Sequence, residues 1–188
     1  MKNYDLDIIQ ENGENVLTDV FPFETNNQIW GAPALDDIDL DGLQDVVISS
    51  KDNFVYVFDM NGLKWSFNAN SQLIGTPAIA NVNQSLEKEI IISGYSSNED
   101  NYIILNHLGQ EIDNVEIIDK NKSGFAIADF NNNNLDDVVF GTDDNKIYLM
   151  YEGEQLAPGF PFLGNDKFRT APVVLKMPEQ LIILAASK

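Results

Sequence analysis

Short apolar runs, separated by polar turns, recur at a nearly fixed interval along the chain. Three segments align without a gap: GAPALDDIDLDGLQDVVISS from Gly31, GTPAIANVNQSLEKEIIISG from Gly75 and SGFAIADFNNNNLDDVVFGT from Ser123. A fourth and weaker copy, TAPVVLKMPEQLIILAAS, begins at Thr170. The corresponding positions Pro33, Pro77, Phe125 and Pro172 are 44, 48 and 47 residues apart. Such regular self-similarity predicts a repeat protein.

Each repeat is expected to form four short strands. The first strand consists of small apolar residues, as in TPAIANV. The second is almost entirely apolar, as in DVVISS, which indicates burial on both faces. The third is rich in β-branched and aromatic residues, as in FVYVFDM, and a turn such as Asn61-Gly62 connects it to the fourth. No segment has an apolar period of 3.6 residues long enough to require a helix.

Four strands in every repeat predict an all-β fold, a β-propeller with four-stranded blades. A β-sandwich also has short strands, but it is not expected to repeat its sequence blade by blade. Turn glycines recur out of phase with the first marker, at Gly13, Gly62, Gly109 and Gly153. The repeats cover approximately residues 24–67, 68–115 and 116–163.

The ends of the chain are out of phase with a whole number of repeats. The chain opens with the last two strands of a repeat and closes with the first two, and Phe21-Pro22-Phe23 matches Phe160-Pro161-Phe162. Residues 164–188 plus 1–23 would then form a composite fourth blade. A closed four-bladed ring and a fragment of a larger propeller are both compatible with this pattern.

Composition excludes several classes of function. A single domain accommodates 188 residues, and a net charge of −19 opposes binding to nucleic acid or to anionic lipid. The chain has no cysteine, and no apolar run approaches the ~18 residues of a membrane span. Its start, MKNYDLDIIQENG, lacks the apolar centre of a signal peptide, so a signal for export is expected to lie outside this chain.

The acidic charge concentrates in the loop of the first repeat, with the pattern Asp-x-Asp-x-Asp-Gly-x-x-Asp. Alternate oxygens in a tight loop can face one point, and the glycine permits the bend. A hard cation takes about six to eight oxygen ligands. The candidate ligands are the side chains of Asp37, Asp39, Asp41 and Asp45 and the backbone carbonyl of Leu43. An EF-hand is excluded because its twelfth position, which requires Glu, is Ile48, and because strands flank the loop.

The corresponding loops of the other repeats have fewer carboxylates. The third repeat offers Asp129, Asn131, Asn133, the backbone carbonyl of Leu135, and Asp137, with Asn134 at the bend, and weaker binding is expected there. The second repeat has one carboxylate, Glu89, and a leucine at the bend, so no metal is expected. The alternative for both acidic loops is a polar turn that binds no metal.

With this motif the sequence resembles the FG-GAP/VCBS repeat family, which includes the calcium-binding blades of integrin α-subunit propellers. Residues 37–45 match the family motif in full, and the repeat period extends the likeness over nearly the whole chain. The resemblance implies a β-propeller whose loop between the first two strands of a blade holds Ca²⁺. The letters Gly31-Ala32-Pro33 precede the loop, whereas in integrins they follow it, so integrin functions do not transfer.

These expectations favour a calcium-stabilised, non-enzymatic binding or adhesion scaffold with a protein or glycan ligand. Millimolar calcium suits a secreted, cell-surface or periplasmic location. The alternative is the propeller portion of a polysaccharide-active or other secreted enzyme, although no catalytic constellation is recognisable and the single histidine, His107, lies beside a turn. Trp30 and Trp65 could contact a ligand or pack between blades.

Overall fold

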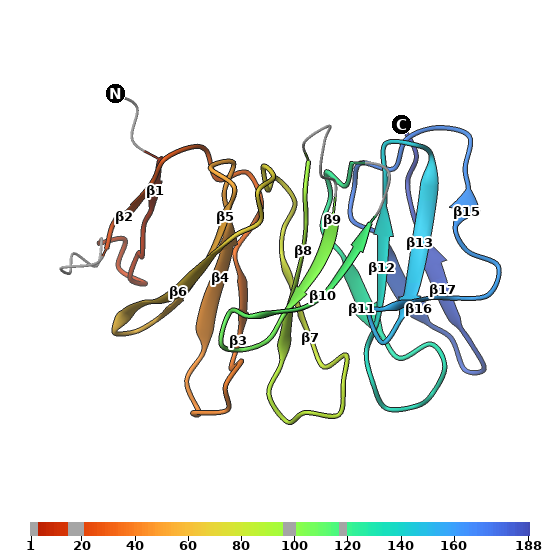
Figure 1. The fold of residues 1–188 in the computed structure, drawn as a ribbon, viewed down its shortest axis with the longest axis horizontal. Coiled ribbons are helices and arrows are strands. Elements are labelled where there is room, and N and C mark those ends of the chain that lie inside the picture. The colour runs from red at the N-terminus through yellow and green to blue at the C-terminus, as the bar shows by residue number, and fades with distance from the viewer. Residues whose placement is uncertain (1–3, 15–20, 96–100, 117–119) are drawn as a thin grey trace.

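The computed structural model describes residues 4–14, 21–95, 101–116 and 120–188, and these residues form antiparallel sheets and no helix. Figure 1 shows the sheets standing side by side in an arc, in chain order from one end to the other. The all-β architecture predicted from the repeats is confirmed. Within the described ranges no helix is long and apolar enough to cross a membrane.

Each of the three central repeats forms one blade of four strands in sequential order. Blade 1 contains β3 (Ala34–Asp36), β4 (Asp45–Ser49), β5 (Phe54–Asp59) and β6 (Gly62–Asn68). Blade 2 contains β7 (Ala78–Ala80), β8 (Glu89–Ser93), β9 (Asn101–Leu105) and β10 (Glu111–Glu116). Blade 3 contains β11 (Ala126–Ala128), β12 (Asp137–Gly141), β13 (Lys146–Tyr151) and β14 (Gln155–Leu156), and β15 (Phe162–Leu163) pairs with the other end of β13.

A half-blade of two strands lies at each end of the arc. The N-terminal half-blade is β1 (Tyr4–Leu6) with β2 (Phe23–Thr25), and the C-terminal half-blade is β16 (Val173–Lys176) with β17 (Leu181–Leu184). The pairing of Phe23 with Leu6 matches that of Phe162 with Ile147. The N-terminal half-blade therefore corresponds to the second half of blade 3, as the repeated Phe-Pro-Phe segments indicate.

The two half-blades do not meet in this structure. They lie at opposite ends of the long axis in Figure 1, and among the described strands no ladder joins β1–β2 to β16–β17. Residues 164–188 and 1–23 thus form two separate sheets, and the closed four-bladed ring is not confirmed.

The core lies between neighbouring blades, because their second and third strands are apolar on both faces. Between blades 1 and 2 it includes Val47, Val57, Ile90, Ile92 and Leu105, all fully or almost fully buried. A backbone hydrogen bond joins each blade to the one before it in a recurring pattern. Its donor and acceptor pairs are Lys51 N to Gln28 O, Tyr95 N to Gln72 O, Asp143 N to Lys120 O and Lys188 N to Lys167 O, at 2.8–3.1 Å. The C-terminal half-blade therefore docks on blade 3 as the complete blades dock on one another.

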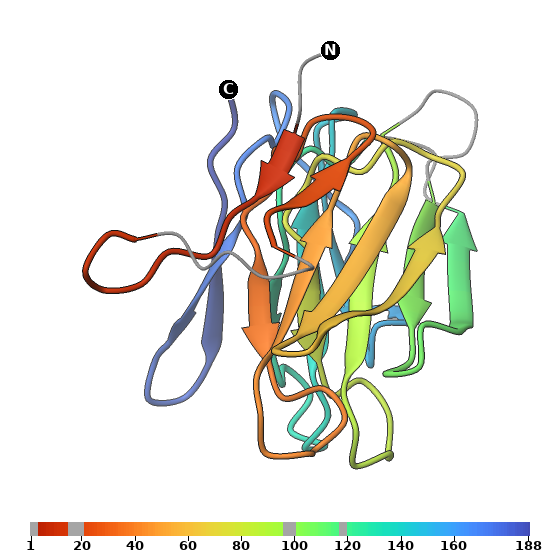
Figure 2. The same cartoon turned by 90° about the vertical axis from the view of Figure 1, so that its left-hand side faces the viewer.

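The loops between the first two strands of the blades share one location. In Figures 1 and 2 the β3–β4, β7–β8 and β11–β12 loops all project from the lower edge of the arc. The repeat thus presents three versions of one loop side by side.

Candidate metal site

One hydrogen bond is common to all three loops and requires no metal. The acidic residue that begins the second strand of each blade accepts the backbone N–H seven residues before it. The pairs are Asp45 with Ile38 at 3.2 Å, Glu89 with Val82 at 3.1 Å, and Asp137 with Phe130 at 2.6 Å. These acids are buried, so each of them anchors the start of its loop.

A second carboxylate shapes the first and third loops. Asp37 accepts the backbone N–H groups of Asp41 at 3.1 Å and Gly42 at 2.9 Å. Asp129 accepts those of Asn133 and Asn134 in the same way. Gly42 has a φ of 89° and Asn134 a φ of 68°. Asn134 therefore replaces glycine in the left-handed region, as the sequence predicts.

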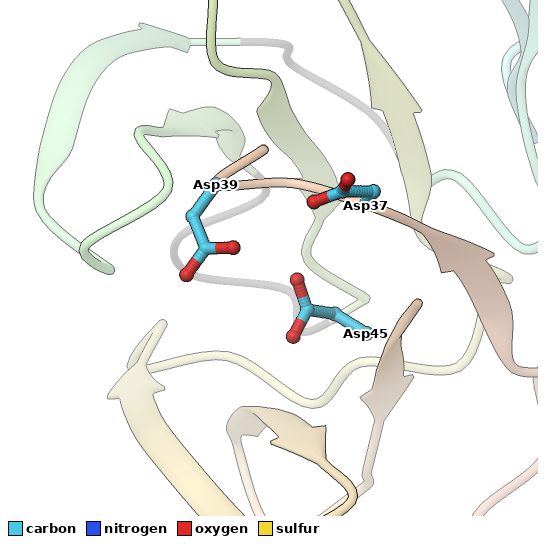
Figure 3. Close-up of side chains that lie close together, drawn as sticks. All are labelled: Asp37, Asp39 and Asp45. Atoms are coloured by element: carbon cyan, nitrogen blue, oxygen red, sulfur yellow. The ribbon is translucent and has the colours of Figure 1, made fainter. Parts of the chain in front are cut away.

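Three of the predicted ligands of the first loop come together. Asp37, Asp39 and Asp45 each offer a carboxylate oxygen, and these oxygens all lie within 4.8 Å of one another. Figure 3 shows the three side chains converging between the ribbon segments that carry them. Asp41 does not join the group. It is exposed, and its Oδ1 accepts the N–H of Leu43 at 2.8 Å.

A lysine that the sequence analysis did not single out reaches into this cluster. Lys64, on β6 of the same blade, places its Nζ 2.6 Å from Asp39 Oδ2 and 2.9 Å from Asp45 Oδ1. Its hydrogen bond lowers the pKa of Asp39. Burial opposes the charge of Lys64 itself, but the bonds to Asp39 and Asp45 outweigh it and raise the lysine pKa. The signal for Lys64 is its place on the fourth strand, which crosses the corner of the blade where the loop begins.

The Asp39 carboxylate retains an unused acceptor. Its Oδ1 is buried and has no hydrogen-bond partner, whereas Oδ2 binds Lys64. Three carboxylates share one ammonium group, so negative charge exceeds positive charge in the cluster. A buried carboxylate oxygen without a donor is costly unless a further cation binds it. Oxygen donors in this number fit a hard cation such as Ca²⁺.

The third loop has a different neighbour. Glu152, from the turn between β13 and β14, accepts hydrogen bonds from the side-chain amides of Asn131 and Asn133 through Oε1. Its backbone N–H donates to Asp137 Oδ1 at 2.9 Å. Burial raises the pKa of Asp137. Among the described residues only the first loop brings three acidic side chains within metal-ligand distance of one another.

The second loop satisfies its single carboxylate internally. Glu89 accepts from Val82 N, from the side-chain amide of Asn83 at 2.8 Å and from Ser85 Oγ at 3.1 Å. Burial nevertheless raises the pKa of Glu89. These three donors take the place that a cation would fill.

Comparisons with known proteins identify the fold and not a family. No family model matches the sequence, and no curated protein matches it. Similar solved structures include the C-terminal domain of PilY1 from Pseudomonas aeruginosa, with a TM-score of 0.71 and 13% identity over 99% of this chain and 52% of that chain. A second is BBS1N in complex with ARL6DN, with a TM-score of 0.66 and 9% identity over 86% of this chain and 52% of that one.

A third likeness is to BamB from Moraxella catarrhalis, with a TM-score of 0.53 and 16% identity over 77% of this chain and 41% of that chain. The chain thus spans about half the length of these structures or slightly less. At such low identity the likeness concerns the arrangement of strands alone. The chain has a β-propeller-like fold.

Proposed function

We propose that this chain is a non-enzymatic, protein-binding β-propeller scaffold whose first loop binds Ca²⁺. The observation that carries the calcium assignment is the unpartnered, buried Oδ1 of Asp39 within the cluster that Asp37 and Asp45 complete. The resemblance of residues 37–45 to the FG-GAP/VCBS loop supports the same metal.

The bound ion would offset the repulsion between the three carboxylates, which are its ligands on this chain. Because the ligands come from the loop and from the first residue of β4, binding would stabilise the lower corner of blade 1. This stabilisation equals RT ln(1 + [Ca²⁺]/Kd), about 2.7 kcal/mol when calcium exceeds Kd a hundredfold. Millimolar calcium outside cells or in the periplasm supports a location in one of these compartments.

The ammonium group of Lys64 and a calcium ion would compete for Asp39 and Asp45. Both are cations, and Lys64 already binds one oxygen of each carboxylate. Lys64 would therefore lower the calcium affinity and would pair with the two carboxylates when calcium is absent. The loop in this proposal alternates between two counterions and is never without one.

Two observations support a protein as the binding partner. Of the similar structures, BBS1N is a complex with another protein, ARL6DN. The net charge of −19 on this chain would steer a basic protein surface toward it. The blades supply a rigid frame for exposed loops, which is the form in which propellers present binding surfaces.

Calorimetric titration with CaCl₂ and thermal melts with calcium or with EGTA test the metal assignment. We expect saturable binding of one ion and a Tm that is roughly 5–10 °C higher at a hundredfold excess over Kd. Identical melting curves and no heat of binding would contradict it. Affinity capture from the source proteome, compared in calcium and in EGTA, tests the scaffold role. The expected result is a partner that also binds the purified chain at a defined stoichiometry.

A further inference from the structure

The two half-blades at the ends of the arc are complementary parts of one blade. The C-terminal half-blade ends with β17, a second strand that lacks the third strand found beside β4, β8 and β12. The N-terminal half-blade begins with β1, a third strand that lacks the second strand found beside β5, β9 and β13. Among the described strands, each half therefore exposes the edge that the other would pair with.

The complete blades define the register in which the halves would join. Val173 pairs with Leu184 as Ala126 pairs with Val139, so Leu184 corresponds to Val139 and Ile183 to Val138. At the other end, Leu6 corresponds to Ile147 through the matching pairs with Phe23 and Phe162. Since Val138 pairs with Met150 and Val139 with Leu149, the equivalent pairs are Ile183 with Ile9 and Leu184 with Ile8. The same count places Gly13 at the position of Gly153 in the following turn.

Exposure marks these edges as incomplete. Ile9 is 65% exposed, whereas its equivalents Phe58, Leu105 and Met150 are at most 2% exposed. Leu184 is 53% exposed, whereas its equivalents Val47, Ile91 and Val139 are fully buried. Large apolar residues at positions that are buried in each complete blade favour association through these edges.

The edge of the C-terminal half-blade borders an apolar groove. The groove has a volume of about 470 Å³, and its lining includes Leu149, Phe160, Phe162, Phe168, Ile183 and Ala185. Residues paired directly across two strands lie on the same face of the sheet. A strand added beside β17 would therefore place its Ile9 on the face that carries Ile183, over this groove.

The charges of the two ends are also complementary. The described part of the N-terminal half-blade carries Asp5, Asp7, Glu11, Glu14 and Glu24 and no basic side chain. Residues 164–188 carry Lys167, Arg169, Lys176 and Lys188 against Asp166 and Glu179. In a chain with a net charge of −19, an acidic end facing a basic end favours a head-to-tail encounter.

We infer that β1–β2 of one copy completes the C-terminal half-blade of a second copy, and that two copies close a ring through two such junctions. The two ends of one arc lie far apart along its long axis (Figure 1), which favours a second copy over closure within one chain. The arc superposes over 99% of its length on 52% of the PilY1 domain, so two arcs match a complete propeller in extent. Six complete blades and two composite blades give a ring within the usual range of propellers.

The mass of the purified 188-residue chain in solution tests this inference. We expect twice the 21.0 kDa of one chain by light scattering. Ile9→Lys and Leu184→Lys each place a charge in both junctions and should raise the dissociation constant about tenfold or more, until the single chain predominates. Leu86→Lys changes a residue that is 81% exposed on the β7–β8 loop and should leave the dimer intact. A chain of 21.0 kDa at high concentration, or a dimer that resists both junction variants, would overturn the inference.

Cysteine cross-linking tests the register and separates a second copy from closure within one chain. The chain contains no cysteine, so Ile9→Cys and Ile183→Cys can be introduced on separate copies. The mixture should form a disulfide-linked pair of chains on a non-reducing gel, whereas a mixture of Leu86→Cys and Ile183→Cys should not. When both cysteines are on the same chain, a disulfide within a single chain would show self-closure and would refute the second copy. Neither experiment depends on calcium binding.

Discussion

Trp65 donates a hydrogen bond from Nε1 to the backbone oxygen of His107 at 2.9 Å. The bond crosses from β6 of blade 1 to the turn between β9 and β10 of blade 2. Trp65 also packs against the buried core between these blades. Trp65 is therefore inter-blade packing, one of the two roles open to it from sequence. Trp30, by contrast, is 62% exposed, with Lys51 Nζ 4.2 Å from the centre of its ring.

The contact between Gly109 and Trp65 predicts a specific sensitivity to substitution. Gly109 has a φ of 75°, and an added Cβ would lie 2.7 Å from the indole ring. Gly109→Ala should therefore lower the unfolding free energy by about 1–3 kcal/mol, because it adds a steric clash to the strained backbone. Chemical denaturation measures this change. The matched control is Gly13→Ala, where φ is 83° and nothing lies within 4 Å. Equal losses in both variants would refute the role of the indole ring.

The first loop predicts different effects for two neighbouring carboxylates. Asp39→Asn should abolish most of the calcium-dependent rise in Tm, because it removes the carboxylate that carries the unpartnered oxygen. Asp41→Asn should retain most of that rise, because Asp41 lies outside the group of three carboxylates. Thermal melts of both variants in calcium and in EGTA measure the difference. If Asp41→Asn alone loses the response, the ligand set differs from that seen in the structure.

Competition between Lys64 and calcium predicts a gain of affinity on removal of the lysine. Lys64→Gln deletes a cation that binds Asp39 and Asp45, so the calcium dissociation constant should fall roughly tenfold, as expected when about 1.4 kcal/mol of competition is removed. Without calcium the same variant should be less stable than the parent chain, because the carboxylates lose their counterion. Titration calorimetry and melts in EGTA measure the two effects. Unchanged affinity would mean that the lysine and the ion occupy separate positions.

Glu89 predicts a pH dependence in the second blade. Burial raises its pKa above the ordinary 4.5, so between these two values the folded state binds more protons than the unfolded state. The unfolding free energy contributed by Glu89 therefore falls as the pH rises through this window and is constant above it. Glu89→Gln removes this titration, so its stability relative to the parent chain should increase across the window. Denaturation curves from pH 4 upward check the prediction, and parallel pH profiles for the two proteins would contradict it.

The repeat pattern predicts the blades well because it records local properties. Apolar second and third strands, the turn at Asn61-Gly62 and the bend at Asn134 all depend on a few consecutive residues. Lys64 and Glu152 could not be found in this way, because each approaches its loop from a later strand or turn of the same blade. The position of Asp41 also escaped prediction, since alternation alone does not show which carboxylate turns outward.

The hydrogen bond from the acid of each second strand to the loop start has a wider consequence. Because Asp45, Glu89 and Asp137 hold their loops by the same bond, the residues between the two anchored ends are free to vary in chemistry. One loop binds an ammonium group, another a set of neutral donors, and the third a glutamate. The corner of the blade therefore works as an interchangeable cassette, in which new binding properties can arise without any change to the frame that carries them.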